Sequence, residues 1–478
     1  MSFLKLFKKV RTRIAPSPTG TLHIGTARTA LFNYIFAIQN KGDFVLRIED
    51  TDKQRSDKRF EQDILDGLEW LNIKYNEFYR QSERNETYRK YLKKLLKKGD
   101  AFFCYHTKEE LHAEKTRQMQ NKEAPRHICE HKNIKPKTQS GSIIRLKGTD
   151  KKIKFQDMIR GEIEYNGSLL GDLAIAKNEN TPLYNFAVVI DDHEMKISHI
   201  IRGEDHIPNT PKQILIQEAL NIKRPFYAHI PLILGADKSK LSKRHGATSV
   251  NEYKRTGYLP EAMINFMALL GWNPGDNREL MNKKELFNIF SIKKIQKGGA
   301  VFDIEKLNWF NKEHIKKMPT NELSQEIEKY IPKDWKEKTK KDKKYWEKII
   351  DLEKERLVKL SDIGKGIEFF FVKPNFPKSL LVWKQGDLDS TKQHLDKIYE
   401  ILSTLKESKF KQEKIKEVVW NYAEERGRGN VLWPFRVALT GLAKSPEPFT
   451  VASILGKKET LERLDYARNM IFGNPSYS

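Results

Sequence analysis

The stretch Arg-Ile-Ala-Pro-Ser-Pro-Thr-Gly-Thr-Leu-His-Ile-Gly-Thr, residues 13–26, constrains the fold more than any other part of the sequence. The residues from Lys9 to Ala15 read as a short strand, and three residues then break both strand and helix, namely Pro16, Pro18 and Gly20. A helix is predicted from Leu22, because apolar residues recur at helical spacing at Leu31, Ile35 and Ile38. The sequence therefore predicts a strand, a sharp turn and a helix with His23 in its first turn.

This arrangement suits a phosphorylated ligand. A helix N-terminus carries about half a positive charge and unpaired N–H groups, and both favour phosphate. Gly25 has no Cβ, so a flat base or a ribose can approach the backbone there. Taken alone, the same residues are equally compatible with a strand, a turn and a helix that carries a solvated histidine.

Two charged residues stand at the expected carboxyl ends of neighbouring strands. Gly42 is the expected end of the first helix, and Asp43 to Glu49 then reads as a second strand, which opens a parallel α/β sheet. Ligands of such sheets sit at the carboxyl ends of the strands, where Arg13 and Glu49 fall. A guanidinium binds a carboxylate and a carboxylate holds an ammonium, so the pair suits an amino acid. An Arg–Glu ion pair at a strand edge is the alternative.

A second stretch, Lys240-Leu-Ser-Lys-Arg244, lies far downstream in a loop. His23-Ile-Gly-Thr26 resembles the HIGH signature of class I aminoacyl-tRNA synthetases, and the second stretch resembles their KMSKS loop. With the two prolines of the first stretch, Arg47-Ile-Glu-Asp-Thr-Asp52 and Arg202-Gly-Glu-Asp-His206 resemble bacterial glutamyl-tRNA synthetases, over nearly the whole chain. The resemblance implies an α/β fold with a Rossmann-type class I synthetase catalytic domain, an inserted acceptor-binding domain and an all-α anticodon-binding region.

The resemblance also implies a reaction and its residues. Glutamate would react with ATP to form glutamyl-adenylate, and the glutamyl group would then pass to tRNA(Glu). Catalysis is assigned to His23, Lys240 and Lys243. ATP binding is assigned to His23, Gly25, Thr26, His206, Lys240, Ser242, Lys243 and Arg244, and glutamate binding to Arg13, Ala15, Ser17, Glu49, Tyr184 and Arg202. Because Mg²⁺ would arrive with ATP, the acidic residues Asp191, Asp192, Glu204 and Asp205 are interpreted as turn caps and supporting acceptors.

Composition agrees with this reading without proving it. The chain has 478 residues and a net charge of +24, which favours a polyanionic partner, although a drift in composition toward lysine would give the same value. We expect tRNA and no DNA, and a monomer. No apolar run reaches the ~20 residues of a membrane span, and two cysteines indicate a reducing cytoplasm. Met1 to Lys8 reads as a short extension ahead of the usual family start.

Both cysteines of the chain lie two residues before a histidine, in Cys104-Tyr-His106 and Cys129-Glu-His131. Two such pairs separated by a loop are the layout of a structural Zn²⁺ site with four ligands. Bacterial members of the resembled family can carry zinc here, although His106 stands where a cysteine is common. Two buried thiols with incidental histidines are the alternative. His112 and His127 are close in sequence, so the fourth ligand is the least defined.

We expect four segments along the chain. The first half of the catalytic domain covers residues 1–101, and the inserted domain covers 102–190, where the apolar run Thr181–Ile190 returns to the sheet. The second half, with the stem-contact region and the Lys240 loop, covers 191–318. The helical anticodon-binding region covers 319–478.

The C-terminal segment bears on which tRNA is read. It shows helical periodicity and no β-barrel pattern, whereas glutaminyl-tRNA synthetases typically carry β-barrels there. Arg356 matches the position at which discriminating glutamyl enzymes place an arginine that reads the last anticodon base. An arginine on a solvated helix face is the alternative.

Four other functions stay open at this point. They are a glutaminyl-type enzyme, a glutamyl enzyme that also charges tRNA(Gln), a basic RNA-binding protein with a degenerate synthetase fold, and a small-molecule adenylyltransferase. The helical C-terminal segment disfavours the first, and the intact His23 and Lys240 disfavour the third. An adenylyltransferase would not need a basic helical C-terminal half.

Overall fold

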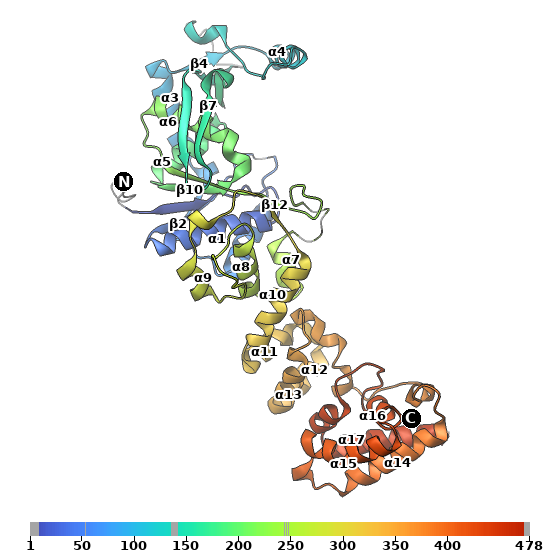
Figure 1. The fold of residues 1–478 in the computed structure, drawn as a ribbon. Coiled ribbons are helices and arrows are strands. Elements are labelled where there is room, and N and C mark those ends of the chain that lie inside the picture. Colours follow the sequence, from blue (N-terminus) through green and yellow to red (C-terminus); the bar gives the residue numbers. More distant parts are fainter. Residues whose placement is uncertain are drawn as a thin grey trace. The chain divides into compact units, whose positions relative to one another are not determined.

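The computed structural model describes residues 9–52, 54–134, 142–242, 244, 246 and 248–472 (Figure 1). The chain divides into two compact units, Met1–Phe310 and Asn311–Ser478. The predicted boundary at 318/319 lies a few residues beyond this division, which falls within helix α10 (Ile304–Lys317), and it stays a prediction.

The first unit is built on parallel strands, as the sequence predicts. Strand β1 (Arg11–Ile14) pairs with β2 (Asp43–Ile48), which pairs with β3 (Glu77–Arg80). On the other side, Ser198 N donates to Arg11 O at 2.9 Å and brings β10 (His199–Gly203) beside β1. Strand β10 pairs in parallel with β11 (Phe226–Ile230).

Two further strands extend this sheet beyond β11. Strand β6 (Lys152–Asp157) pairs with β11 at Tyr227 and Asp157, and β7 (Gly161–Asn166) runs antiparallel to β6. Both strands fall inside the range 102–190 that we assign to the inserted domain. That range therefore also supplies neighbours to the catalytic sheet, a feature that its sequence did not indicate.

The helix that follows β1 crosses the core. Helix α1 (Ile24–Gln39) buries residues on most of its circumference, including Ile24, Leu31 and Phe32, against helix α8 (Pro260–Leu269) and the sheet. Its N-cap is His23, one residue after the predicted start, and its C-cap is Asn40 rather than the vicinity of Gly42. The other α-helices of the first unit are α2 (Lys58–Trp70), α3 (Asn85–Lys98), α4 (Lys108–Gln120), α5 (Tyr184–Glu194), α6 (Thr210–Leu220), α7 (Val250–Arg255) and α9 (Lys283–Ile289).

The rest of the assigned insertion forms a separate antiparallel sheet in the order β4-β5-β8-β9. These strands are β4 (Ala101–Cys104), β5 (Ile143–Leu146), β8 (Leu173–Asn178) and β9 (Thr181–Pro182). They share a core with α3, α5 and α6. A short parallel pair, β12 (Ile233–Leu234) and β13 (Ala300–Val301), follows β11.

One predicted strand is wrong. The run Thr181–Ile190 forms only the two residues of β9 before it becomes helix α5 (Tyr184–Glu194). The residues from Phe186 to Asp192 are all buried, so the middle of this helix is buried on every side and its run of apolar residues shows no 3.6-residue periodicity. A short apolar run of this kind cannot be assigned to strand or helix from the sequence pattern. Asp191 and Asp192 are not turn caps, since both lie within the helix, but both accept hydrogen bonds from arginine side chains, as the other half of that interpretation predicts.

The second unit is helical over its described residues, 311–472, as the sequence predicts. Its elements after α10 are α11 (Thr320–Ile327), α12 (Lys333–Lys341), α13 (Lys343–Lys354), α14 (Leu388–Thr404), α15 (Gln412–Arg426), α16 (Arg428–Thr440) and α17 (Pro448–Phe472). Helices α14 to α17 pack on one another through buried residues such as Leu395, Val419, Phe435 and Leu464. None of the described helices has the length and apolar character that a membrane crossing requires.

Candidate functional site

A cavity of about 600 Å³ opens where the carboxyl ends of β1, β2, β10 and β11 meet. Twelve of the predicted site residues line it, namely Arg13, Ala15, Ser17, His23, Gly25, Thr26, Glu49, Tyr184, Arg202, His206, Lys240 and Ser242. Several others that the sequence did not single out also line it, including Arg28, Thr29 and Leu232. Residues as far apart in sequence as Arg13 and Ser242 thus share one wall.

Two further predicted residues, Arg244 and Arg356, are not among those that line the cavity. Lys243 lies outside the described residues. The side chain of Arg244 is 66% exposed and pairs with Asp237 at 3.0 Å. Arg356 belongs to the second unit, where it follows α13 in a turn, is half exposed and lies 3.3 Å from Glu353.

His23 is fixed by the helix that it starts. Its Nδ1 accepts the backbone N–H of Gly25 at 3.0 Å, as an N-cap does. Nδ1 is therefore unprotonated in this contact, and the proton of the neutral imidazole sits on Nε2. Burial lowers the pKa of His23, and the nearby Lys240 lowers it further. At neutral pH the cavity thus meets a neutral histidine that can donate from Nε2.

Lys240 brings the downstream loop to the same cavity. Its Nζ forms an ion pair with Asp205 at 2.8 Å, and both side chains are partly exposed. Leu241, the next residue, is buried in the core that contains α1, so the described part of the loop is anchored. The ammonium group therefore lies at the cavity with an exchangeable partner, and an anion could replace that partner.

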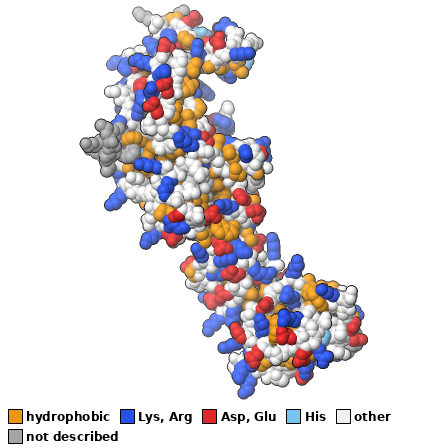
Figure 2. Space-filling view, in the orientation of Figure 1, with side chains coloured by type: hydrophobic (Ala, Val, Ile, Leu, Met, Phe, Trp, Pro, Cys, Tyr) orange, Lys and Arg blue, Asp and Glu red, His pale blue; other side chains and the backbone are white. Residues whose placement is uncertain are grey.

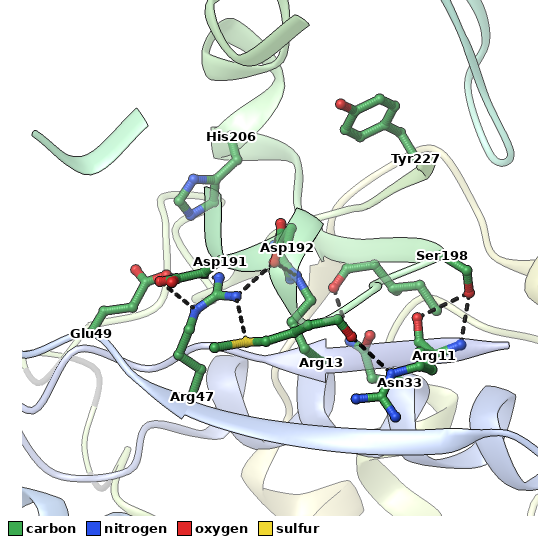
Figure 3. Close-up of polar contacts among 12 residues, drawn as sticks. Arg11, Arg13, Asn33, Arg47, Glu49, Asp191, Asp192, Ser198, His206 and Tyr227 are labelled. Atoms are coloured by element: carbon green, nitrogen blue, oxygen red, sulfur yellow. Dashed lines mark hydrogen bonds and ion pairs between the residues drawn. The ribbon is translucent and has the colours of Figure 1, made fainter. Parts of the chain in front are cut away.

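A buried network of charged side chains lies beside the cavity (Figure 3). Asp192 of α5 accepts Arg47 Nη1 at 2.7 Å and Arg13 Nε at 3.3 Å, and Arg47 Nη2 reaches Glu49 at 3.2 Å. Asp191 accepts Arg84 Nε at 2.6 Å. Burial would raise the pKa of Asp192, but Arg13 and Arg47 outweigh it and hold the pKa below its ordinary value.

The charges of this group balance when its neighbours are counted. When all are ionised, four guanidinium groups stand against four carboxylates: Arg13, Arg47, Arg84 and Arg202 against Glu49, Asp191, Asp192 and Asp157, which reaches Arg202 through His229. Of these eight groups, Arg13, Arg202 and Glu49 line the cavity. Two guanidinium groups and one carboxylate suit a ligand that carries two carboxylates and one ammonium.

Arg202 has hydrogen-bonding capacity that the described residues leave unfilled. It is 5% exposed and lines the cavity, and its Nη1 has no hydrogen-bond partner among the described residues. Burial lowers its pKa below the ordinary arginine value, and Arg13 lowers it further. An orphaned, buried N–H group at a cavity wall indicates a ligand acceptor, here a carboxylate.

Tyr184 and His206 close the same side. The Tyr184 hydroxyl lies 3.2 Å from His206 Nδ1, and the two rings are tilted against each other at 6.0 Å. Burial lowers the pKa of His206 to about 4, with Arg202 adding to the effect, so the imidazole is neutral at pH 7. Burial also raises the pKa of Glu49, against the attraction of Arg47 and Arg13. A bound ammonium would favour the ionised form of Glu49.

Comparison with known proteins agrees with this geometry. The family profile described as "tRNA synthetases class I (E and Q), catalytic domain" matches residues 9–309, and the profile "Anticodon binding domain" matches 322–468. The "Glutamate--tRNA ligase 1" of Caldicellulosiruptor saccharolyticus is 41% identical, over 96% of this chain and 99% of that protein. The "Glutamate--tRNA ligase" of Aquifex aeolicus is 41% identical, over 95% of this chain and 98% of that protein.

The chain belongs to the glutamate–tRNA ligase family.

A solved member of this family has the same architecture. A glutamate tRNA ligase from Elizabethkingia meningosepticum, crystallised in complex with its amino acid, is 35% identical with a TM-score of 0.85. The match covers 96% of this chain and 99% of that one. The predicted family and the predicted fold class, a class I synthetase catalytic domain followed by a helical anticodon domain, are confirmed.

The family's synthetase fold explains a residue that the motifs alone did not mark. Arg28 of α1 is buried, lines the cavity and donates to the backbone carbonyl groups of Leu270 (at 2.8 Å) and Pro231. It ties the His23 helix to the segment that leads to the Lys240 loop. A single charged residue in a helix that is otherwise uncharged was the available signal, because a buried arginine needs specific acceptors.

The two Cys-x-His pairs come together away from the cavity. One ligand atom from each of Cys104, His106, Cys129 and His131 lies within 4.8 Å of the others. His106 Nδ1 is 3.5 Å from Cys104 Sγ and 3.7 Å from Cys129 Sγ, and His131 Nδ1 is 3.5 Å from Cys129 Sγ. Tetrahedral Zn²⁺ with ordinary Zn–S and Zn–N distances puts sulfur and nitrogen about 3.6 Å apart. The donor set and its dimensions therefore fit zinc.

His127 is a competing neighbour of this group. Its Nε2 lies 3.6 Å from Cys104 Sγ, and its Nδ1 lies 2.6 Å from Glu114. A carboxylate on the far nitrogen is how metal-binding histidines are often oriented. His131 Nδ1 in turn accepts the N–H of Tyr105 at 3.2 Å, a contact that a metal would have to replace.

Proposed function

We propose that this chain attaches L-glutamate to tRNA(Glu) in an ATP-dependent reaction that passes through glutamyl-adenylate. The observation that carries the proposal is the pair of guanidinium groups, Arg13 and Arg202, that line the cavity with Glu49, together with the Nη1 of Arg202, which has no hydrogen-bond partner among the described residues. Free glutamate has two carboxylates and one ammonium, which match these three groups. Glutamine has a neutral amide in place of the side-chain carboxylate and would leave Arg202 without a charged partner. The names and 41% identity of the family members above support the same reaction.

Glutamate binding follows from the charged groups. Arg202 would bind the side-chain carboxylate, and Arg13, held by Asp192, would add a second cation. Glu49 and the Tyr184 hydroxyl would accept from the ammonium, with Ala15 and Ser17 on the adjacent wall. The α-carboxylate would then face the α1 N-terminus, where ATP phosphates are favoured.

Adenylate formation is the first step. An α-carboxylate oxygen attacks the α-phosphorus of ATP, a new O–P bond forms, and the bond to pyrophosphate breaks. Negative charge grows on the phosphorus oxygens and on pyrophosphate, so fixed donors accelerate the step. His23 would donate from Nε2 and Lys240 from Nζ, with Gly25, Thr26, His206, Ser242 and, from the sequence motif, Lys243 and Arg244 as further ATP contacts.

Transfer is the second step. A hydroxyl oxygen of the terminal tRNA ribose attacks the carbonyl carbon of the adenylate, the C–O bond to AMP breaks, and the hydroxyl proton leaves. No covalent bond to the protein is needed. Class I synthetases use ATP with Mg²⁺, and Mg²⁺ when bound neutralises phosphate charge.

The basic character of the chain supports a tRNA partner. Lys and Arg side chains occur over much of the visible face, interspersed with Asp and Glu (Figure 2). The second unit matches an anticodon binding domain, and its described residues form helices rather than the β-barrels of glutaminyl enzymes. We further propose that the chain acts as a monomer and that it works in the cytoplasm, where a reducing environment suits two cysteines that form no disulfide.

The selection of tRNA(Glu) over tRNA(Gln) is assigned to Arg356. Its side chain is half exposed and forms an ion pair with its neighbour Glu353, so the exposed part of the guanidinium can meet a base. Arg356→Gln should lower charging of tRNA(Glu) relative to tRNA(Gln) by about 10-fold or more, because one good bidentate base contact is lost. Labelled glutamate and separate transcripts of the two tRNAs measure this ratio, with Lys365→Gln as an exposed control. Equal charging of both tRNAs by the unaltered enzyme would contradict the role of Arg356, but the proposed reaction would stand.

The Cys/His group is assigned to structural zinc. We expect about one zinc per chain by metal analysis, and Cys104→Ser should remove it and lower the melting temperature by roughly 5 °C. His112→Ala is the matched control, since His112 is exposed on α4 and outside the four-residue group. Loss of zinc in His127→Ala but not in His131→Ala would show that His127, and not His131, is the fourth ligand. A chain purified without chelator that contains no zinc would contradict the assignment.

The test of the proposed function is charging itself. Labelled glutamate should become attached to tRNA(Glu) only when ATP, Mg²⁺ and the enzyme are all present. A protein that binds tRNA but attaches no glutamate would instead support the RNA-binding alternative.

A further inference from the structure

Two buried side chains that belong to none of the sequence motifs lie behind Arg202. His229 of β11 contacts Arg202 of β10, and Asp157 of β6 contacts His229. Neither Asp157 nor His229 lines the cavity. We propose that His229, held by Asp157, is a positioning residue that orients the Arg202 guanidinium toward the side-chain carboxylate of glutamate. The inference rests on the proposed function and deepens it.

The first observation is how Arg202 is held. Its Nε donates to His229 Nε2 at 3.2 Å, and its Nη2 donates to Thr210 Oγ1 at 2.8 Å. Within the described part of the chain Nη1 has no hydrogen-bond partner. Two of the three nitrogens therefore fix the plane of the guanidinium from behind, and the third is left for the ligand. The direction of Nη1 follows from the two contacts that hold the others.

The second observation defines the proton on His229. Its ring is fully buried, and its Nδ1 lies 2.7 Å from Asp157 Oδ2. Asp157 also accepts the backbone N–H groups of Ile159 and Arg160, each at 3.0 Å. A carboxylate with several donors is ionised, so Nδ1 must carry the proton that it shares with Asp157. Nε2 then carries a lone pair, and it can accept the hydrogen bond that the Nε–H of Arg202 donates.

The charge states agree with this assignment. Burial would raise the pKa of Asp157, but the hydrogen bonds from His229 and the backbone outweigh it and keep the pKa below its ordinary value. Burial lowers the pKa of His229, and Arg202 lowers it further against the pull of Asp157. A histidine protonated on both nitrogens would direct an N–H group at the N–H of Arg202. The neutral form with hydrogen on Nδ1 is the one that fits.

The third observation is that three adjacent strands hold the series. Residues Arg202 and His229 are direct partners in the register of β10 and β11, and Asp157 pairs with Tyr227 at the junction of β6 and β11. The backbone N–H of His229 also donates to Asp157 at 3.1 Å. The sheet thus places a carboxylate, an imidazole and a guanidinium in line with no loop between them. Such support is what a ligand-binding arginine needs to stay within a fraction of an ångström of its working position.

A purely structural role is the competing explanation, because Asp157 and His229 also join β6 to β11. It predicts a loss of stability in any variant, without a selective effect on glutamate. The positioning role predicts that glutamate binding depends on a hydrogen-bond acceptor at the position of His229 Nε2. It predicts no such dependence on the rest of the imidazole ring.

Two substitutions of His229 separate the explanations. Gln can place its amide oxygen near the position of Nε2 and accept from Arg202, whereas Leu fills a similar volume without an acceptor. His229→Leu should raise the KM for glutamate by about 10- to 100-fold, and His229→Gln by no more than about 3-fold, because a hydrogen bond to a charged group is at stake. The KM for ATP and kcat should change less than about 3-fold in either variant.

A third variant addresses the imidazole proton directly. Asp157→Asn lets the amide donate to Nδ1, which moves the proton to Nε2 and turns it toward Arg202. Its KM for glutamate should rise as in His229→Leu, although His229 is intact. His199→Gln is the matched control, since His199 is a buried histidine on β10 that lies beside Phe226 and away from Arg202. It should leave the KM for glutamate unchanged.

The outcome is read from charging kinetics of folded variants, with the unaltered enzyme in the same assay. A selective rise in KM for glutamate in His229→Leu and Asp157→Asn, with recovery in His229→Gln, supports the inference. An unchanged KM in the first two variants, or an equal rise in all three, overturns it while the proposed function stands. An unaltered enzyme that attaches no glutamate overturns both.

Discussion

Replacing Arg202 with glutamine is expected to lower kcat/KM for glutamate by about 1,000-fold, the scale seen when a site built for a polar substrate group loses its partner. The substitution removes a positive charge from the cavity wall and an Nη1 group that has no hydrogen-bond partner among the described residues. The side-chain carboxylate of glutamate would then lose its charged donor. The expected loss lies mainly in KM, because the arginine contacts the side chain rather than the reacting carboxylate.

The same variant should bring glutamate and glutamine closer together as substrates. Its measurement is charging of tRNA with each amino acid over a range of concentrations. Arg463→Gln is the matched control, since Arg463 is a buried arginine of the second unit with its own acceptors, Glu459 and Leu439 O. A decrease of kcat/KM below about 10-fold in Arg202→Gln would show that this guanidinium does not contact the substrate, because a bidentate charged contact is worth more.

Replacing His23 with alanine or asparagine should lower kcat by about 100- to 1,000-fold, as removal of one transition-state donor typically does. The two variants separate two roles of the same ring. Asparagine can accept the Gly25 N–H as Nδ1 does at 3.0 Å, so it keeps the cap of α1 but has nothing at the position of Nε2. Alanine loses both.

The pair is therefore compared by activity and by stability together. Both should be equally slow in charging at saturating glutamate and ATP. Only alanine should lose about 1 kcal/mol of unfolding free energy, which a chemical denaturation curve measures. If asparagine restored the rate, the imidazole would act only as a helix cap, and the donor role of Nε2 would be wrong.

Local motifs predicted much of the cavity because each motif sits at the carboxyl end of its own strand. The first stretch, Glu49, Arg202 and Lys240 could be brought together by the rule for parallel sheets alone. The contacts between them were not predictable. Arg47 and Asp192 are 145 residues apart, and nothing local in the sequence says that helix α5 places Asp192 between two arginines.

Two elements were missed for a physical reason. Strand β3 (Glu77–Arg80) has charged residues at both ends and partly exposed side chains throughout, so no apolar alternation marks it. Helix α5 was read as a strand because burial on all sides removes the helical period. The role inferred for His229 could not be predicted from the sequence either, since it depends on contacts with Arg202 and Asp157, which belong to two other strands.

The central claim is that Arg202 and Arg13 select a substrate that carries a side-chain carboxylate. Its most direct test is the ratio of kcat/KM for glutamate over glutamine in the charging of tRNA(Glu) by the unaltered enzyme, with ATP and Mg²⁺. Our account predicts a ratio of about 1,000 or more, since discrimination rests on a buried charge rather than on shape. Comparable charging with glutamine would contradict it, because the two guanidinium groups would then have no part in the choice of substrate.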